Sequence, residues 1–140
     1  MLGITIAQQL KDAGVEWKPL PRDMFALPDR DMDDHIFVIN FMTIGIGMLR
    51  GEPVVTFFGA TDMPLDYIPL SEAVWLPSEA QLRVILERGL VERNMAGMQL
   101  TSTADGYTCQ IKQGDEAVSF DGFGVDEVYA QAVLYVLNLS

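Results

Sequence analysis

The chain has 140 residues, 49% of them hydrophobic, and its 20 acidic and 9 basic side chains give a formal net charge of −11. This length and composition exclude a mostly disordered protein and predict a single domain over residues 1–140 with a sizeable core. The negative charge repels phosphate backbones and anionic lipid surfaces, so we expect partners that are neither nucleic acids nor membranes.

Cys109 is the only cysteine, which excludes an intrachain disulfide and favours a reducing compartment. The N-terminus lacks the basic segment that opens a signal peptide. The longest apolar run, residues 36–49, is too short to span a membrane. These features together predict a cytoplasmic protein.

The first predicted element is a short N-terminal helix. Thr5 and Gln8 have the spacing of a capping box, and Gly14 followed by Val15 is typical of a Schellman ending. Residues 16–28 then contain three prolines, which cannot donate to a β-ladder. We therefore expect this segment to be an edge strand or a loop.

Four aspartates lie within residues 29–34 and interrupt the apolar pattern. Their spacing begins like a calcium loop, but Asp34 stands where the loop needs glycine and Asn40 where it needs a bidentate glutamate. We interpret the segment as a solvated acidic loop and keep a weak cation site as the alternative. His35, the only histidine, is interpreted as a surface residue at a strand entrance.

Apolar and β-branched runs predict strands over residues 36–39 and 53–58. Residues 42–49 are ambiguous, because Gly45 and Gly47 weaken both helix and strand. With Gly51 these glycines have the spacing of a nucleotide-binding fingerprint, but a strand follows where a helix would have to receive the phosphate. We therefore predict no cofactor. Residues 59–69 are expected to be mainly loop.

The clearest helix follows this loop. Ser78 and Gln81 form a capping box, Glu79 adds favourable charge to the first turn, and Gly89 is predicted to end the helix. Three short strands are then expected at residues 98–102, 107–112 and 117–120.

Two-residue hairpin turns are predicted at Asp105-Gly106 and Gly114-Asp115. The last helix is uncharged from Val128 to Leu137, which indicates burial over most of its circumference. The expected fold is therefore α+β, with about three helices packed on a largely antiparallel sheet and a C-terminal half ordered helix, three-stranded meander, helix. Double-stranded-RNA-binding domains share this order, but Asp126 and Glu127 stand where they carry basic residues.

No motif predicts a catalytic or metal centre. Cys109 alternates onto the same strand face as two apolar residues and is interpreted as a small buried hydrophobe. A candidate ligand-binding pocket is predicted near Asp62, Asp66, Tyr67 and Trp75.

Residues 65–67 and 74–83, together with residues 130–137 and the opening phrase 13–19, carry a resemblance. On these residues the chain resembles a group of small uncharacterised bacterial and phage proteins, some of which bear a pilus-assembly label. That label belongs to proteins with an ATPase domain, and this sequence has no P-loop. The resemblance therefore implies a single domain and no particular mechanism.

The favoured hypothesis is a non-enzymatic, acidic protein-binding or regulatory module, because the charge suits a basic protein partner. Self-association as a homodimer through an apolar helix or a sheet edge is one form of this hypothesis. The alternative is a small enzyme or ligand-binding protein that uses the Asp62–Trp75 pocket. A third hypothesis is a structural element of a phage or surface assembly.

Overall fold

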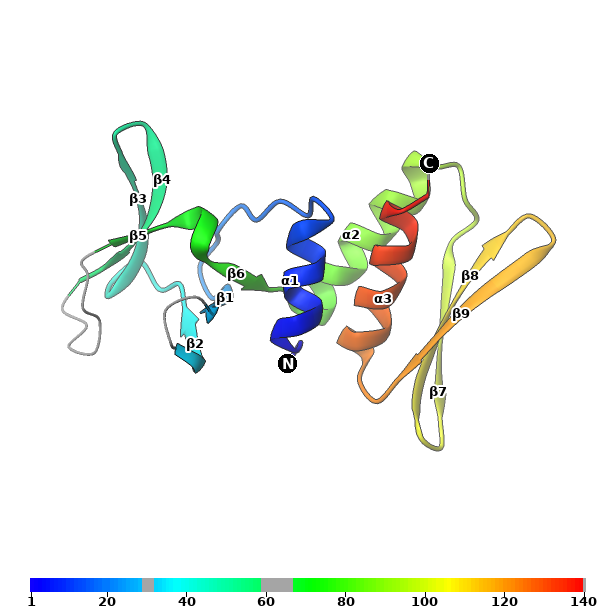
Figure 1. The fold of residues 1–140 in the computed structure, drawn as a ribbon. Coiled ribbons are helices and arrows are strands. Elements are labelled where there is room, and N and C mark those ends of the chain that lie inside the picture. The colour runs from blue at the N-terminus through cyan, green and yellow to red at the C-terminus, as the bar shows by residue number, and fades with distance from the viewer. Residues whose placement is uncertain (29–31, 59–66, 140) are drawn as a thin grey trace. The chain divides into compact units, whose positions relative to one another are not determined.

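The computed structural model describes residues 1–28, 32–58 and 67–139. The chain has an α+β fold, with three α-helices and three small antiparallel sheets of three strands each (Figure 1). Its contacts divide it into two compact units, one of residues 1–15 with 77–140 and one of residues 16–76. The predicted antiparallel α+β class and the C-terminal helix–meander–helix order are confirmed, although the strands form three small sheets instead of one.

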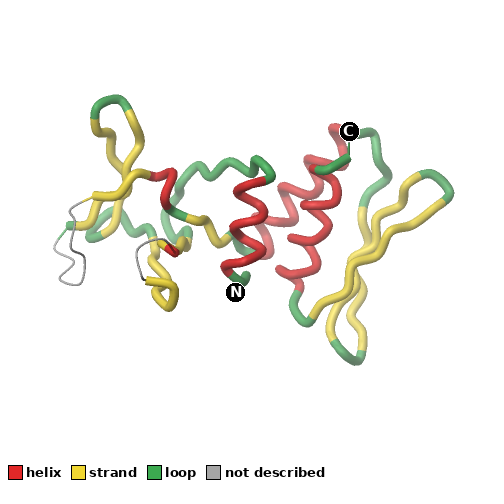
Figure 2. Tube along the Cα trace, viewed as in Figure 1, coloured by secondary structure: helices red, strands yellow, loops and turns green. Residues whose placement is uncertain are grey.

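The first unit, residues 1–15 with 77–140, contains all three α-helices and one sheet. Its elements are α1 (Ile4–Asp12), α2 (Glu79–Glu92), β7 (Met98–Thr103), β8 (Gly106–Gln113), β9 (Glu116–Gly122) and α3 (Val125–Leu137). The helices lie side by side, and α3 contacts α1, α2 and the strands β8 and β9 (Figure 2). The six buried residues of α3 are Val128, Tyr129, Ala130, Ala132, Val133 and Val136. The apolar C-terminal helix is thus buried within its own unit.

The structure confirms one capping box and contradicts the other. Ser78 Oγ accepts from Gln81 N at 3.3 Å, and Gln81 Oε1 accepts from Ser78 N at 2.9 Å. By contrast, α1 begins after Gly3, whose side chain cannot cap, so the box predicted at Thr5 is wrong. The Schellman ending of α1 is confirmed, since Gly14 has a positive φ of 99° and Val15 N donates to Leu10 O.

Gly89 does not end α2. The helix continues to Glu92 and ends with Asn94 in the left-handed region at φ 54°. Gly89 is instead a contact point between helices, because a Cβ added there would lie 3.1 Å from Val136 Cγ1 on α3. The prediction was wrong because glycine also serves where two backbones approach closely.

The β7–β8 turn lies one residue earlier than predicted. Thr103 pairs with Gly106, so Ala104 and Asp105 are the turn residues. Gly106 has a φ of 148°, and a Cβ there would lie 2.2 Å from Gly122 O. Glycine is needed at this position because the adjoining strand leaves no space for a side chain.

The second unit, residues 16–76, contains two sheets, of order β2-β1-β6 and β3-β4-β5. Its elements are β1 (Met24–Leu27), β2 (Met32–Val38), β3 (Ile44–Leu49), β4 (Glu52–Phe57), β5 (Tyr67–Pro69), the 3₁₀ turn η2 (Leu70–Glu72) and β6 (Val74–Leu76). The expected edge or loop over residues 16–28 contains β1, which is a central strand. None of its three prolines falls within β1, so they do not interrupt that ladder.

Three further differences concern strand boundaries in the second unit. The ambiguous segment 42–49 is mostly strand, as β3. β2 begins at Met32, inside the segment expected to be an acidic loop. The predicted loop 59–69 ends in the strand β5, and its residues 59–66 lie outside the described part of the chain.

The core of the second unit is shared by both of its sheets. Its buried members are Phe25, Leu27, Ile39, Val55, Phe57, Ile68 and Ala73. Aromatic rings connect the two sheets, since Phe37 lies 5.3 Å from Phe25 and 5.8 Å from Phe57 between ring centroids. One face of the β3-β4-β5 sheet is therefore committed to this core.

Candidate functional site

The other face of the β3-β4-β5 sheet is apolar and exposed, and we call it the outer face. Residues alternate between the two faces of a strand, and Val55, Phe57 and Ile68 lie on the core face. The alternate positions on the three strands, with Phe58 just after β4, therefore make up the outer face: Gly45, Gly47, Leu49, Glu52, Val54, Thr56, Phe58, Tyr67 and Pro69.

A groove of about 530 Å³ runs over this sheet. It is lined by Gly47, Met48, Leu49, Val54, Thr56, Phe57, Phe58 and Tyr67. The glycines keep the groove open, because a Cβ at Gly47 would lie 3.3 Å from Thr56 Cγ2. A side chain larger than hydrogen at this position would begin to fill it.

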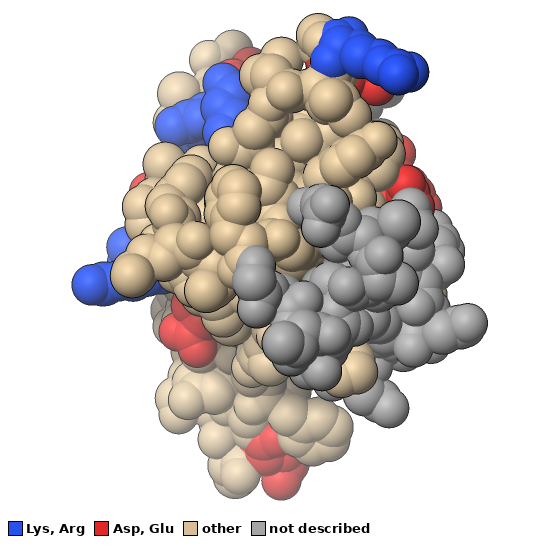
Figure 3. Space-filling view, turned by 90° about the vertical axis from the view of Figure 1, so that its left-hand side faces the viewer, with Lys and Arg blue, Asp and Glu red and all other residues tan. Residues whose placement is uncertain are grey.

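The walls of the groove expose large apolar side chains. The exposed fractions are 39% for Leu49, 68% for Met48, 59% for Phe58 and 45% for Tyr67. None of the eight lining residues that the structure describes is charged. Figure 3 views the molecule from the left-hand side of Figure 1, and the part of this surface that is not grey is mostly uncharged, with charged side chains towards its margins. Contiguous exposed apolar surface of this kind marks binding sites.

The β3–β4 hairpin that carries the groove has a tight turn. Arg50 and Gly51 both have positive φ, at 52° and 83°, which is the signature of a type I′ turn. Leu49 pairs with Glu52 across it, so the register of the hairpin is fixed by the turn. The glycine spacing 45-47-51 belongs to this hairpin, in which no helix follows, as predicted.

Of the four predicted site residues, the structure describes Tyr67 and Trp75, and these two do not line the same groove. Tyr67 lines the groove, whereas Trp75 lies on β6 in the other sheet and is not among the lining residues. Asp62 and Asp66 lie outside the described residues. The predicted pocket therefore stays a prediction for its carboxylates.

Trp75 belongs to an aromatic pair. Its ring stacks on Trp17 with centroids 6.4 Å apart and an interplanar angle of 9°. The Nε1 of Trp17 donates to Asp23 Oδ2 at 2.9 Å, and Leu20 N donates to the same oxygen at 3.0 Å. Trp75 Nε1 is buried without a hydrogen-bond partner among the described residues. Asp23 is thus a buried carboxylate that fixes the chain segment before β1.

Of the predicted cation and general-base candidates, the structure describes the side chain of His35. His35 is exposed on β2, with its ring 6.3 Å from that of Phe37. The described residues contain no group of three or more His, Cys, Asp or Glu side chains that could hold a metal ion. Residues 29–31 and the side chains of residues 32–34 lie outside the description.

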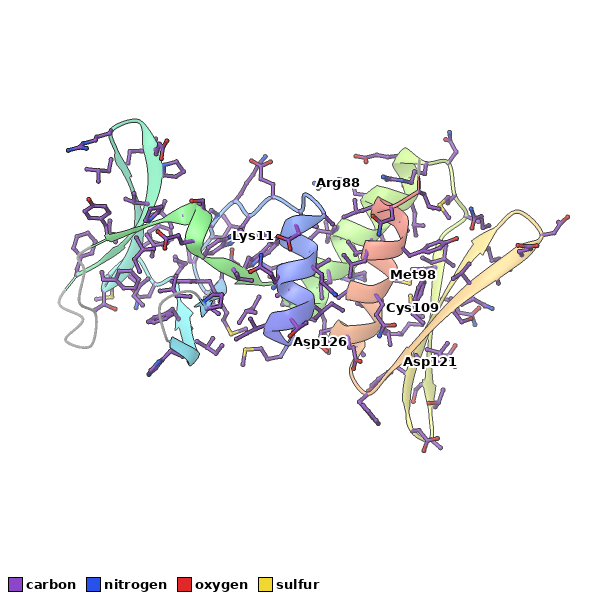
Figure 4. The ribbon with its side chains drawn as sticks, in the orientation of Figure 1. Lys11, Arg88, Met98, Cys109, Asp121 and Asp126 are labelled. Carbon is purple, nitrogen blue, oxygen red and sulfur yellow. The ribbon has the colours of Figure 1, made fainter. Side chains whose placement is uncertain are left out.

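Cys109 is a buried thiol between α3 and the β7-β8-β9 sheet. Its exposed fraction is 0%, and Figure 4 shows it with Met98 on the helix side of the strands. Burial raises the pKa of the Cys109 thiol, which disfavours the reactive thiolate. Burial also raises the pKa of Tyr129 on α3. Both residues act as core side chains.

Sequence reasoning located Tyr67 but missed the rest of the outer face. The missed residues are Gly45, Gly47, Leu49, Glu52, Val54, Thr56, Phe58 and Pro69. The available indication was the run of residues 53–58, which is apolar at both alternations and so predicts two apolar sheet faces. This indication was missed because the glycines of β3 made the assignment of that strand ambiguous.

The chain was compared with protein-family models, with curated proteins and with solved structures, and no match was found in any of the three comparisons. No helix within the described residues is both long and apolar enough to cross a membrane. The case for function therefore depends on the geometry of the outer face.

Proposed function

We propose that this chain is a protein-binding module that recognises its partner with the outer face of the β3-β4-β5 sheet. The observation that carries the proposal is the exposure of Leu49, Phe58 and Tyr67 around one uncharged groove. Aromatic side chains of this kind dominate the energetics of protein interfaces. The acidic net charge keeps the free protein soluble while this apolar surface is exposed.

A site-specific photocrosslinker tests this proposal in living cells. A benzophenone amino acid replaces Phe58, and adducts formed on irradiation are identified by mass spectrometry. Phe123, which is 85% exposed and lies in the other unit, is the matched control position. We expect a defined protein adduct from position 58 that is absent from position 123. Equal labelling from both positions, or no adduct from position 58, would overturn the proposal.

Tyr67→Ser provides the second arm of this experiment. Tyr67 lies on β5, on the opposite side of β4 from β3, and its exposed ring forms one wall of the groove. We expect the substitution to weaken adduct formation from position 58 by at least about tenfold, because losing an aromatic hot spot commonly costs 2 kcal/mol or more. An unchanged yield would mean that the partner does not use the groove.

A small apolar ligand is the second candidate occupant. The groove volume of about 530 Å³ falls in the range of ligand pockets, and Tyr67 supplies one hydroxyl to its wall. This is the remaining form of the ligand-binding hypothesis, with Asp62 and Asp66 unplaced. A small ligand would leave position 58 without a protein adduct, so the same experiment separates the two candidates.

A further inference from the structure

The outer edge of β3 is available for pairing. Among the described strands, β3 has a neighbour only on the β4 side. Phe58 N donates to Thr43 O at 2.6 Å, which makes these two residues a hydrogen-bonded pair. Because bonded and non-bonded pairs alternate along an antiparallel ladder, the odd-numbered residues of β3 bond to β4 and the even-numbered ones turn away. Pro53 fits this alternation, since it lies opposite Met48, where no N–H is needed.

Some backbone groups on this edge already have hydrogen-bond partners. Ile44 N donates to Asn40 Oδ1 at 3.1 Å, and Ile44 O accepts from Asn40 N at 3.1 Å and Phe41 N at 2.8 Å. The outward N–H and C=O groups that remain on β3 are those of Ile46 and Met48. They form a short segment with two donors and two acceptors.

The strand lacks the devices that normally protect an edge. Residues 44–49 include no charged side chain and no proline, and the strand follows the β4 ladder without a bulge. Such edges pair with another strand unless they are covered. Building on the protein-binding function proposed above, we propose that the occupant is a second copy of this chain, paired antiparallel along β3 about a two-fold axis at Gly47.

The backbone selects this register. With the axis at Gly47, Ile46 of each copy lies opposite Met48 of the other, and the pair forms four N–H···O bonds. An axis at Ile46 would require the backbone groups of Ile44, which Asn40 and Phe41 already occupy. An axis at Met48 would draw the turn residue Arg50 into the ladder. Only the Gly47 axis uses the free groups without disturbing existing bonds.

The side chains are compatible with the same register. Gly47 lies opposite its own copy, so the closest pair at the axis carries no side chains. Leu49 lies opposite Gly45 of the other copy, beside the Phe41 ring, whose Cδ1 would be 3.6 Å from a Cβ at Gly45. Leu49 and Phe41 are both partly exposed in the free chain and would cover each other.

The local surface does not itself select a basic partner. The described residues of the groove and the strand offer no carboxylate to a basic surface, although the chain as a whole is acidic. In the Gly47 register the two Arg50 residues are six positions apart along the ladder, or about 20 Å at 3.4 Å per residue. This exceeds the Debye length of about 8 Å at physiological salt, so their repulsion is screened.

The alternative surface for self-association is already used. The apolar C-terminal helix was the other predicted dimer element, and α3 buries six residues against elements of its own unit. The sheet edges of that hypothesis remain. β3 and β7 are both edge strands without charged side chains, and the Met48 variants below test the β3 edge.

Analytical ultracentrifugation of the full chain is the first test. We expect a monomer–dimer equilibrium that strengthens with salt, because each copy has a net charge of −11 and salt screens the repulsion between copies. Met48→Pro removes the outward N–H without affecting a β3–β4 bond, and we expect it to weaken dimerisation at least tenfold. Met48→Ala is the matched control, because it keeps the N–H, and it should remain dimeric. A strict monomer, or a dimer that survives Met48→Pro, would overturn the proposal.

Disulfide trapping tests the register. Gly47→Cys places two thiols at the axis, where the Cα atoms of a non-bonded pair lie about 4.5 Å apart and a disulfide forms readily. Leu49→Cys places them four positions apart, about 14 Å, where no bridge can close. With oxidised glutathione we expect a covalent dimer from Gly47→Cys and not from Leu49→Cys. The reverse result would overturn this register, and the buried Cys109 does not compete.

The two proposals fail separately. Met48→Pro and the trapping variants report only on the β3 edge, whereas the photocrosslinker at position 58 and Tyr67→Ser report on the outer face beyond it. A monomeric protein that still gives a protein adduct from position 58 would overturn self-pairing alone. Loss of the adduct together with an intact, trappable dimer would overturn the outer-face partner alone.

Discussion

Two three-stranded antiparallel sheets in this molecule differ in the polarity of the face that is not packed on a core. In the β7-β8-β9 sheet one face lies under α3, with Cys109 and Ile111 fully buried, and the opposite face is polar, with Thr101, Thr108 and Gln110. In the β3-β4-β5 sheet the core face buries residues such as Val55, while the opposite face is also apolar.

The difference separates what folding requires from what it does not. A sheet needs one apolar face to form a core, and the β7-β8-β9 sheet has only one. On the second apolar face of the β3-β4-β5 sheet, Phe58 and Tyr67 remain exposed to water. This exposure is unfavourable, and no contact within the described part of the fold offsets it. This surplus is the physical basis for placing a binding surface there.

The largest predicted effect concerns the face of the β7-β8-β9 sheet that lies under α3. Ile111→Ala should destabilise the protein by about 2–5 kcal/mol, because it leaves a cavity at a fully buried position on the α3 side of β8. Thr101→Ala on the polar face is the matched control and should change stability by less than about 0.5 kcal/mol. Urea unfolding followed by circular dichroism gives both values, and similar losses would contradict the assignment of faces.

A second prediction uses the thiol at the covered face. Burial raises the pKa of Cys109, so above pH about 8.5 the unfolded chain releases a proton that the folded chain keeps. The contribution of the protonated Cys109 thiol to the free energy of unfolding is complete below its pKa in the unfolded chain. It is lost as pH rises through its pKa in the folded chain, by at most about 1.4 kcal/mol per pH unit.

The measurement for this prediction is the free energy of unfolding from pH 7 to pH 10.5. Cys109→Ala should reduce the alkaline slope, whatever it costs at pH 7. Tyr129, whose pKa burial also raises, adds a later loss that Tyr129→Phe removes. An identical slope in the wild type and Cys109→Ala would mean that the thiol ionises equally well in both states.

Much of the unit that contains the β7-β8-β9 sheet was predictable from sequence, because interactions between residues close in sequence determine its structure. The Ser78 capping box, the alternation around Cys109 and the uncharged stretch of α3 each specify their own structure. The errors there came from glycines whose role is set by distant neighbours. Gly89 meets Val136 and Gly106 meets Gly122, and neither contact can be inferred from adjacent residues.

The candidate site was largely unpredictable for a related reason. β5 and β6 have three residues each, which is too short for a periodic pattern, and their pairing is non-local. The central place of β1 depends on partners at residues 32–38 and 74–76. Without these pairings, the outer face could not be separated from the core face of the same strands.

A third prediction concerns the polar face of the covered sheet. Thr108 Oγ1 donates to Asp121 Oδ1 at 2.6 Å between adjacent strands, at an exposed position. Thr108→Val should cost only about 0.5–1 kcal/mol, since a solvated cross-strand pair contributes little net stability. Chemical denaturation measures the loss, and the double variant with Asp121→Ala should lose little more. A loss above about 2 kcal/mol would show that this face is part of the stable core.

The smallest predicted effect is the one most able to break the comparison. Phe58→Ser and Tyr67→Ser should each change the free energy of unfolding by less than about 0.5 kcal/mol. Both side chains are exposed in the folded chain, so removing them sacrifices little buried apolar area. The matched core-face variant on the same sheet is Ile68→Ala, which should cost about 2–5 kcal/mol because Ile68 is buried. Thermal and urea unfolding at low protein concentration, where no dimer forms, provide the values. If the Phe58 and Tyr67 variants are as destabilising as Ile68→Ala, the outer face is a covered part of the fold and the proposal of an outer-face partner fails. If they are neutral, its apolar side chains have no role in the stability of the monomer, and the interface experiments decide what they bind.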